Sequence, residues 1–173
     1  MCENPYLACL VTLQPIQRYS LDASIIFSDI LVIPRALGLE VVMEDKKGTL
    51  KKAGPVFTSP LKTPQDMERL RDPLPNELDY VYNALYFTRQ QLDGRVPLLG
   101  FCGSAWTLFT YMTEGQSTKV PFKLQMFSEV KKWIFAHPTE SHQVLARINK
   151  ALMLYMESQI EAGAQALQVR PST

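Results

Sequence analysis

The sequence has few cysteines and histidines, and its charges nearly cancel. It contains three cysteines and two histidines in 173 residues, with 18 Lys and Arg against 17 Asp and Glu. An odd number of cysteines without the close spacing of metal ligands argues against a disulfide framework and indicates a reducing compartment, the cytosol. A net charge of +1 gives no electrostatic footprint for nucleic acid or for an anionic membrane. We therefore expect neither as a partner.

Long apolar runs are also missing. No stretch approaches the roughly 20 apolar residues of a membrane span. Glu3, Asn4 and Pro5 interrupt the N-terminal segment where a signal peptide needs a continuous apolar core. The composition, with 46% hydrophobic and 20% charged residues, is ordinary for a soluble globular protein. Since no repeat or low-complexity segment divides the chain, we expect a single domain over residues 1–173.

Helix and strand signals alternate along the chain. Three short apolar runs predict strands at 23–28, 96–101 and 164–169. Apolar spacing and helix-start residues predict helices near 5–15, 64–71, 78–92, 103–112, 127–135 and 139–162. The stretch 41–59 is charged and contains glycine and proline, so it predicts a hairpin-like or irregular excursion. Strand and helix units in series are typical of an α/β fold with a parallel sheet.

The last predicted helix has one apolar face. We expect this face to bury Val144, Leu145, Ile148, Leu152, Tyr155 and Ile160. Gly163 ends the helix and the third strand follows it. The two outer strands of the sheet would leave unpaired edges, which free-standing domains rarely tolerate.

One acid in an apolar run is the first candidate functional residue. Residues 23–34 predict a buried strand that ends on Asp29. Burying an ionised carboxylate costs several kcal/mol unless it is paired or hydrogen-bonded, so Asp29 needs donors. In parallel α/β proteins the residues just beyond the strands line the ligand site, which suits a functional acid. A cap on the next helix, or an ion pair with a basic residue, explains the acid equally well.

Several separate blocks, in one order, resemble the uroporphyrinogen decarboxylase family. They are Leu13-Gln14-Pro15-Ile16, Leu21-Asp22-Ala23, Phe27-Ser28-Asp29-Ile30-Leu31, Leu92 to Phe101, Trp106-Thr107-Leu108, Thr110-Tyr111-Met112, Glu114-Gly115 and Ala162 to Ala166. The order and spacing match across nearly the whole chain. This many blocks in order is far more specific than any single short motif.

The resemblance implies a (β/α)8 TIM barrel, of which this chain supplies a part. We expect an α/β, partial barrel of about three βα units that lacks the N-terminal and C-terminal portions. The implied enzyme is a cofactor-independent decarboxylase that removes the four acetate carboxyls of uroporphyrinogen III. Its product is coproporphyrinogen III, in haem biosynthesis. The resemblance also implies that full-length members are homodimers.

The resemblance assigns roles to three residues. Asp29 matches an acid under the macrocycle, which accepts hydrogen bonds from the pyrrole N–H groups and stabilises the protonated pyrrole by its charge. Tyr111 matches a tyrosine that hydrogen-bonds at the same site, and Phe101 matches an aromatic wall. The resemblance thus implies Asp29 and Tyr111 as catalytic residues, all three as substrate-binding residues, and no cofactor or metal ligands. Without the match, a tyrosine on an apolar helix is more often part of the core, and Phe101 packs in either case.

The chain departs from the family pattern at both ends. Nothing before Met1 supplies the family's loop with an arginine pair, which binds substrate carboxylates. Arg170 to Thr173 stands where the family continues with an acid-serine segment and further βα units. Ala105 stands where proline is usual, and 120–126 has the character of an insertion. Because a (β/α)8 barrel needs about 250 residues, the alternative function is a catalytically inactive fragment: a truncated isoform, another reading frame or an incomplete gene model.

A third class is the related barrel methyltransferases, which hold zinc with a histidine and cysteines. Cys102, His137 and His142 lack the closely spaced ligand cluster that such a metal needs. We expect both histidines on the surface of an outer helix. The sequence therefore disfavours this class.

Overall fold

Three parallel strands form the central sheet of the computed structural model, which describes residues 3–44, 54–74, 76–115 and 127–171. They are β1 (Ser24–Ile25), β4 (Leu98–Gly103) and β5 (Ala166–Arg170), in the order β1-β4-β5. Ile25 is paired with Leu99, and Phe101 with Gln168. The prediction of three parallel strands is confirmed. β4 lies about two residues further along the chain than predicted, and β1 is much shorter.

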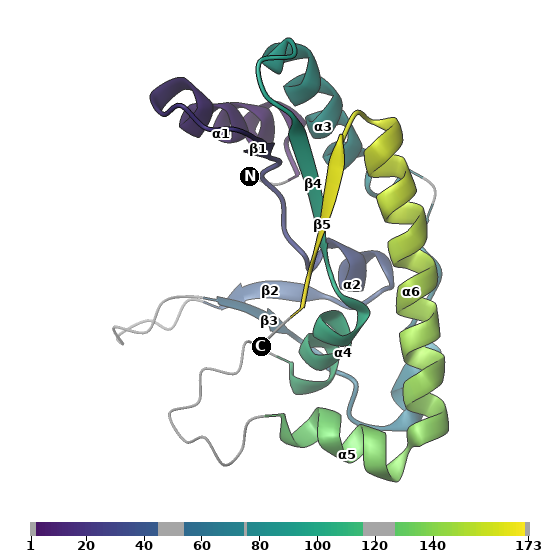
Figure 1. Ribbon diagram of the computed structural model, residues 1–173. Coiled ribbons are helices and arrows are strands. Elements are labelled where there is room, and N and C mark those ends of the chain that lie inside the picture. The colour runs from purple at the N-terminus through teal and green to yellow at the C-terminus, as the bar shows by residue number, and fades with distance from the viewer. Residues whose placement is uncertain (1–2, 45–53, 75, 116–126, 172–173) are drawn as a thin grey trace, which may run out of the picture.

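Helices pack along one face of this sheet. Figure 1 shows α3 (Asp79–Leu92) and α6 (Pro138–Glu161) side by side with β4, and both helices contact that strand. Helix α1 (Pro5–Arg18) packs mainly on α3 and also contacts β1. The crossover from β4 to β5 contains α4 (Ala105–Glu114) and α5 (Ser128–Ala136) before α6. The core lies between the helices and the sheet, and its largest fully buried side chains include Leu37, Leu85, Leu98, Phe109 and Trp133.

Helix α1 begins where the sequence predicts and ends later. The Asn4 side chain accepts hydrogen bonds from the N–H groups of Tyr6 and Leu7, and Pro5 occupies the first turn. We predicted a stop around Pro15, and this was wrong, since the helix runs to Arg18. An interior proline lacks its own N–H bond and crowds the carbonyl four residues earlier, but it does not prevent the following residues from continuing the helix. Its carbonyl still accepts the N–H of Tyr19 at 2.9 Å and closes the last turn.

The excursion between β1 and β4 is a hairpin followed by short helical turns. Strands β2 (Val41–Glu44) and β3 (Gly54–Phe57) pair antiparallel, which confirms the hairpin; residues 45–53 between them lie outside the described residues. The helix predicted at 64–71 is a 3-10 helix, η1 (Pro64–Arg69), with Thr63 and Asp66 forming a capping box. Helix α2 (Val32–Ala36) directly precedes the hairpin. The predicted insertion at 120–126 also lies outside the described residues.

The apolar face of α6 differs from the prediction at its C-terminal end. Val144, Ile148, Leu152 and Tyr155 are buried and Leu145 is half-buried, whereas Ile160 is 57% exposed. The buried stripe continues instead through Gln159, four residues after Tyr155 and therefore on the same face. A polar residue occupies that position because it bonds to the sheet rather than packing on it.

The Arg71–Glu77 ion pair leads to a prediction on pH. Arg71 donates from both terminal nitrogens to the carboxylate of Glu77, at 2.9 and 2.7 Å, and Glu77 also accepts the N–H of Leu74 at 2.9 Å. The Arg71 hydrogen bonds hold the pKa of Glu77 below its ordinary value. Its stabilising contribution is therefore complete above the ordinary carboxyl pKa and is lost as the pH falls through the folded-state pKa.

We expect Glu77→Gln to lower the free energy of unfolding by about 0.5–1 kcal/mol at pH 7 and to make little difference at pH 3. Urea unfolding of both proteins between pH 3 and pH 7 measures this. The exposed Glu157→Gln on α6 is the matched control. If Glu77→Gln lowers the free energy of unfolding equally at the two pH values, the ionised Glu77–Arg71 pair is not the source of the stabilisation.

Candidate functional site

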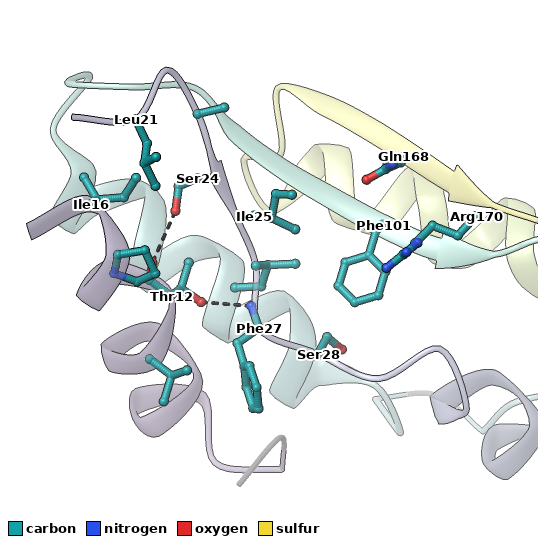
Figure 2. Close-up of a pocket in the computed structure, with 14 residues that line it drawn as sticks. Thr12, Ile16, Leu21, Ser24, Ile25, Phe27, Ser28, Phe101, Gln168 and Arg170 are labelled. Carbon is teal, nitrogen blue, oxygen red and sulfur yellow. Dashed lines mark hydrogen bonds between the residues drawn. The ribbon is translucent and has the colours of Figure 1, made fainter. Parts of the chain in front are cut away.

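The sheet face opposite α3 and α6 is open and borders a cavity of about 470 Å³. Figure 2 shows Ile25, Phe101, Gln168 and Arg170, from three neighbouring strands, on one side of this cavity. Residues of α1 and of the segment that joins it to β1 form the other side: Val11, Thr12, Pro15, Ile16 and Leu21. Phe27 and Ser28 close the cavity at the C-terminal end of β1. The lining is largely apolar, with the Arg170 side chain at one border.

Phe101 is held in place by the side chain of Gln159. The buried Gln159 amide accepts the N–H of Phe101 at 3.1 Å and donates to its carbonyl at 3.3 Å. β1 has ended by this point, so the Phe101 backbone has no strand partner on that side, and the amide takes the place of one. Gly100 permits the contact, because a Cβ there would collide with the Gln159 amide and lie 2.8 Å from Leu167.

Asp29 lies in a different setting from the one expected. The strand ends at Ile25, and Asp29 is an exposed residue in the segment between β1 and α2. The prediction of a buried acid at a strand end is therefore wrong, because the chain leaves the sheet four residues earlier. One oxygen of the carboxylate, Oδ1, accepts the N–H of Leu31 at 2.9 Å. Leu31 is the N-cap of α2, and this helix has no side-chain cap hydrogen bond, so Asp29 forms a turn before the helix and does not cap it. A carboxylate in water retains lone pairs for further donors.

The C-terminal ends of the strands come together beside Asp29. A side chain at Gly103, the last residue of β4, would lie 3.4 Å from the Cβ of Ile30, the residue after Asp29. The carbonyl of Arg170, at the end of β5, accepts the N–H of Ser104 at 3.0 Å and the Thr107 hydroxyl at 3.2 Å. The Asp29 segment, the start of α4 and the end of β5 therefore lie together at the C-terminal ends of the strands. Ligand sites of parallel sheets lie at such ends.

Tyr111 lies on α4, which begins at these same strand ends. It is half-buried and packs against the hydrophobic core. Of the three residues named from the resemblance, only Phe101 lines the cavity; Asp29 and Tyr111 do not. Among the described residues no hydrogen bond joins Asp29 to Tyr111.

Sequence reasoning missed two polar residues of the site, Ser28 and Gln159. The buried Ser28 hydroxyl lines the cavity, and within the described part of the chain it has no hydrogen bond of full geometry. Tyr155, from α6, approaches it closely enough for a weak interaction. Burial raises the pKa of the Tyr155 phenol, so it stays protonated. The position of Gln159 one turn after Tyr155 on the buried face was the available signal for its role.

The candidate metal ligands are dispersed. Cys102 is buried in β4, and burial raises the pKa of its thiol. His142 is exposed, as predicted, whereas His137 is half-buried, with its ring 5.9 Å from that of Trp133. Across residues 3–44, 54–74, 76–115 and 127–171, no three His, Cys, Asp or Glu side chains gather where they could hold a metal ion. Over the same residues, no helix has the length and apolar character to cross a membrane.

The comparisons with known proteins agree with this arrangement. The family model for uroporphyrinogen decarboxylase (URO-D) matches residues 1–173. The chain belongs to the uroporphyrinogen decarboxylase family. Over 170 residues it is 49% identical to the uroporphyrinogen decarboxylases of Ovis aries and of Homo sapiens, covering 97% of this chain and 43% of each relative. The Klebsiella pneumoniae (strain 342) enzyme is 47% identical, over 98% of this chain and 45% of its own length.

The chain therefore spans less than half the length of the curated uroporphyrinogen decarboxylases that it matches. A solved methyltransferase from Methanosarcina mazei has a similar fold, with a TM-score of 0.70 at 20% identity. This similarity covers 98% of the chain and 46% of the methyltransferase. At that identity the likeness concerns the fold alone.

Replacing Gln159 by leucine should destabilise the protein. Gln159→Leu leaves the N–H and the carbonyl of Phe101 without their partners, at a cost of about 1–3 kcal/mol in the free energy of unfolding. The matched control is Gln143→Leu, the same change at an exposed position of α6, which should alter the free energy by about 0.5 kcal/mol or less. Denaturant unfolding measures both. Equal effects of the two substitutions would show that the amide does not support β4.

Proposed function

We propose that this chain is part of a uroporphyrinogen decarboxylase, a cofactor-independent enzyme that converts uroporphyrinogen III to coproporphyrinogen III by removing four acetate carboxyls. The observation that carries the proposal is the family match over residues 1–173, at 47–49% identity to enzymes of that name. In this proposal residues 1–173 are one unit of a (β/α)8 barrel, and the complete enzyme is a cytosolic homodimer.

The sheet edge offers an electrostatic mechanism. Decarboxylation passes through a pyrrole that is protonated on a ring carbon. When carbon dioxide leaves, the electron pair of the broken C–C bond neutralises the positive charge, and a proton added to the exocyclic carbon, with loss of the proton from the ring carbon, gives the methyl group. A carboxylate held close to the pyrrole nitrogens stabilises that charge and accepts their N–H groups. Asp29 suits this role because Leu31 fixes its Oδ1 oxygen and the group remains open to solvent and to further donors.

Phe101 and Tyr111 have supporting roles in this mechanism. Phe101 presents its ring on the open sheet face, where it can pack against a flat macrocycle. Tyr111 would donate or accept one hydrogen bond at the same site. Neither residue carries charge, so we assign the main effect on the rate to Asp29.

The second candidate is a catalytically inactive fragment of the same enzyme. The observation that favours it is the length of the chain, which spans 43% of its mammalian relatives. A (β/α)8 barrel closes with eight strands, whereas the described part of this chain forms three parallel ones. Turnover by the chain alone distinguishes the two candidates.

We expect the isolated chain to show negligible turnover of uroporphyrinogen and poor solubility, because the exposed sheet edges favour association. Chromatographic separation of porphyrins after oxidation measures the turnover. The control is the same chain completed with the remaining segments of the Homo sapiens relative, which should be active. Turnover by the isolated chain would exclude the inactive fragment, and an inactive completed chain would contradict the proposed function.

In the completed chain, Asp29→Asn should separate the charge from the bond to Leu31. Asparagine still accepts the N–H of Leu31, so the free energy of unfolding should hardly change, while loss of the charge should reduce turnover by about a hundred- to a thousandfold. Asp29→Glu keeps the charge one methylene away and should retain more activity than Asp29→Asn. If Asp29→Asn is as active as the parent, Asp29 only supports the turn before α2.

Tyr111→Phe, in the same completed chain, removes one hydroxyl and keeps the ring. The loss of a single hydrogen bond should lower turnover by about ten- to a hundredfold, less than Asp29→Asn. The matched control is Tyr86→Phe on the exposed side of α3, which should leave turnover unchanged. A larger loss for Tyr111→Phe than for Asp29→Asn would reverse the roles given to the two residues.

A further inference from the structure

The backbone just before Asp29 is held by a side chain from another element. Thr12, on α1, is 4% exposed, and its hydroxyl accepts the N–H of Phe27 at 2.9 Å (Figure 2). We propose that Thr12 is a positioning residue for the reaction, because it fixes the segment that carries Asp29. This rests on the proposed function, in which the Asp29 charge stabilises the transition state.

The N–H of Phe27 points away from the sheet. The residue before it, Ile26, still bonds to β4, since its N–H donates to the carbonyl of Leu99 at 2.9 Å. Consecutive residues of an extended chain direct their N–H groups to opposite sides, so the N–H of Phe27 faces α1. The Thr12 hydroxyl lies there and accepts it. The chain is therefore held by β4 on one side and by α1 on the other at the point where it leaves the sheet.

The Thr12 hydroxyl is itself fixed by α1. It donates to the carbonyl of Ala8, one turn earlier in the helix, at 2.7 Å, so its proton is used there and a lone pair is left for the Phe27 N–H. The carbonyl of Thr12 accepts the Ser24 hydroxyl at 3.4 Å, a second bond to the same stretch of chain. These bonds form one connected network, so the position of the backbone at Phe27 follows that of α1.

One residue, Ser28, separates Phe27 from Asp29, and the bonds of the acid itself are local. Its Oδ1 oxygen accepts the N–H of Leu31 at 2.9 Å, and its carbonyl accepts the N–H of Val32 at 3.4 Å. The Ser28 hydroxyl has no hydrogen bond of full geometry in the described part of the chain. Among the described residues, the Thr12 bond is therefore the closest one of full geometry that ties the segment before Asp29 to a side chain of another element.

Charge stabilisation depends on where the carboxylate is held. A preorganised charge acts at the distance that its scaffold sets, and a displacement of about 1 Å can cost about a hundredfold in rate. The Asp29 side chain is exposed, so its position follows from that of its backbone. Removal of the Thr12 hydroxyl leaves the Phe27 N–H without its partner and frees this backbone to shift. We therefore expect a loss of rate in a protein that is still folded.

Thr12→Val, in the completed chain, removes the hydroxyl and keeps a branched side chain. It should lower kcat by about ten- to a hundredfold, whereas Thr12→Ser keeps the hydroxyl and should remain within about threefold of the parent. The matched control is Thr88→Val on α3. Thr88 is fully buried and donates to the carbonyl of Ala84, one turn earlier, at 2.7 Å, but among the described residues it accepts no N–H. The control should leave kcat unchanged, and a folded Thr12→Val with the kcat of the parent would overturn the proposal.

A double-mutant cycle shows whether Thr12 acts through the charge of Asp29. If it does, Thr12→Val should lower kcat by less than about threefold once Asp29→Asn has removed that charge. A Thr12→Val loss that is as large in the Asp29→Asn background as in the parent would overturn the proposal. The cycle also separates two failures. An Asp29→Asn variant as active as the parent contradicts the proposed function, whereas a slow Asp29→Asn variant beside an unimpaired Thr12→Val contradicts the role of Thr12 alone.

Amide hydrogen exchange in the completed chain tests the same link without turnover. Thr12→Val should speed exchange of the Phe27 amide by about tenfold or more, and that of the Leu31 amide, which bonds to Asp29, by about threefold or more. Thr88→Val should change neither rate. A Leu31 amide that does not respond to Thr12→Val would overturn the proposal. If Thr12→Val fails to fold, the parent still decides, because a Phe27 amide that exchanges as fast as in an unstructured peptide would refute the bond to Thr12.

Discussion

The structure depends on the bond between the Gln159 side chain and the backbone of Phe101. β4 is the middle strand of the sheet, but β1 leaves it after Ile25, and the backbone polar groups of β4 beyond that point need another partner. The Gln159 amide supplies both a donor and an acceptor. This pairing fixes α6 on the sheet, requires a glycine at position 100, and holds the Phe101 ring on the open face.

The candidate site lies at the C-terminal ends of the strands. Asp29, the start of α4 and the end of β5 lie there, where the reacting groups of a parallel α/β enzyme are expected. The largely apolar cavity lies along the side of β1 and is lined by Phe101.

Asp29 makes a structural contact and is also the proposed catalytic acid. Its carboxylate accepts the N–H of Leu31, which fixes the segment before α2, and it is open to solvent at the edge where Gly103 and Ile30 meet. A structural contact through Oδ1 preorganises the group rather than competing with a functional role. The rate and the stability of Asp29→Asn therefore report on different properties of one side chain.

The sequence by itself determined the family, the α/β class, the parallel strands and most helix boundaries, because these follow from local signals such as the Asn4-Pro5 helix start and the apolar period of α3. The sequence did not predict the features that depend on contacts between residues far apart in the chain. β1 stops at Ile25, Asp29 is exposed, and α6 buries Gln159 rather than Ile160, since each depends on what the opposing element offers. Hydrogen-bond partners 58 residues apart, such as Phe101 and Gln159, leave no periodic signal in the sequence, so only the tertiary structure could decide them.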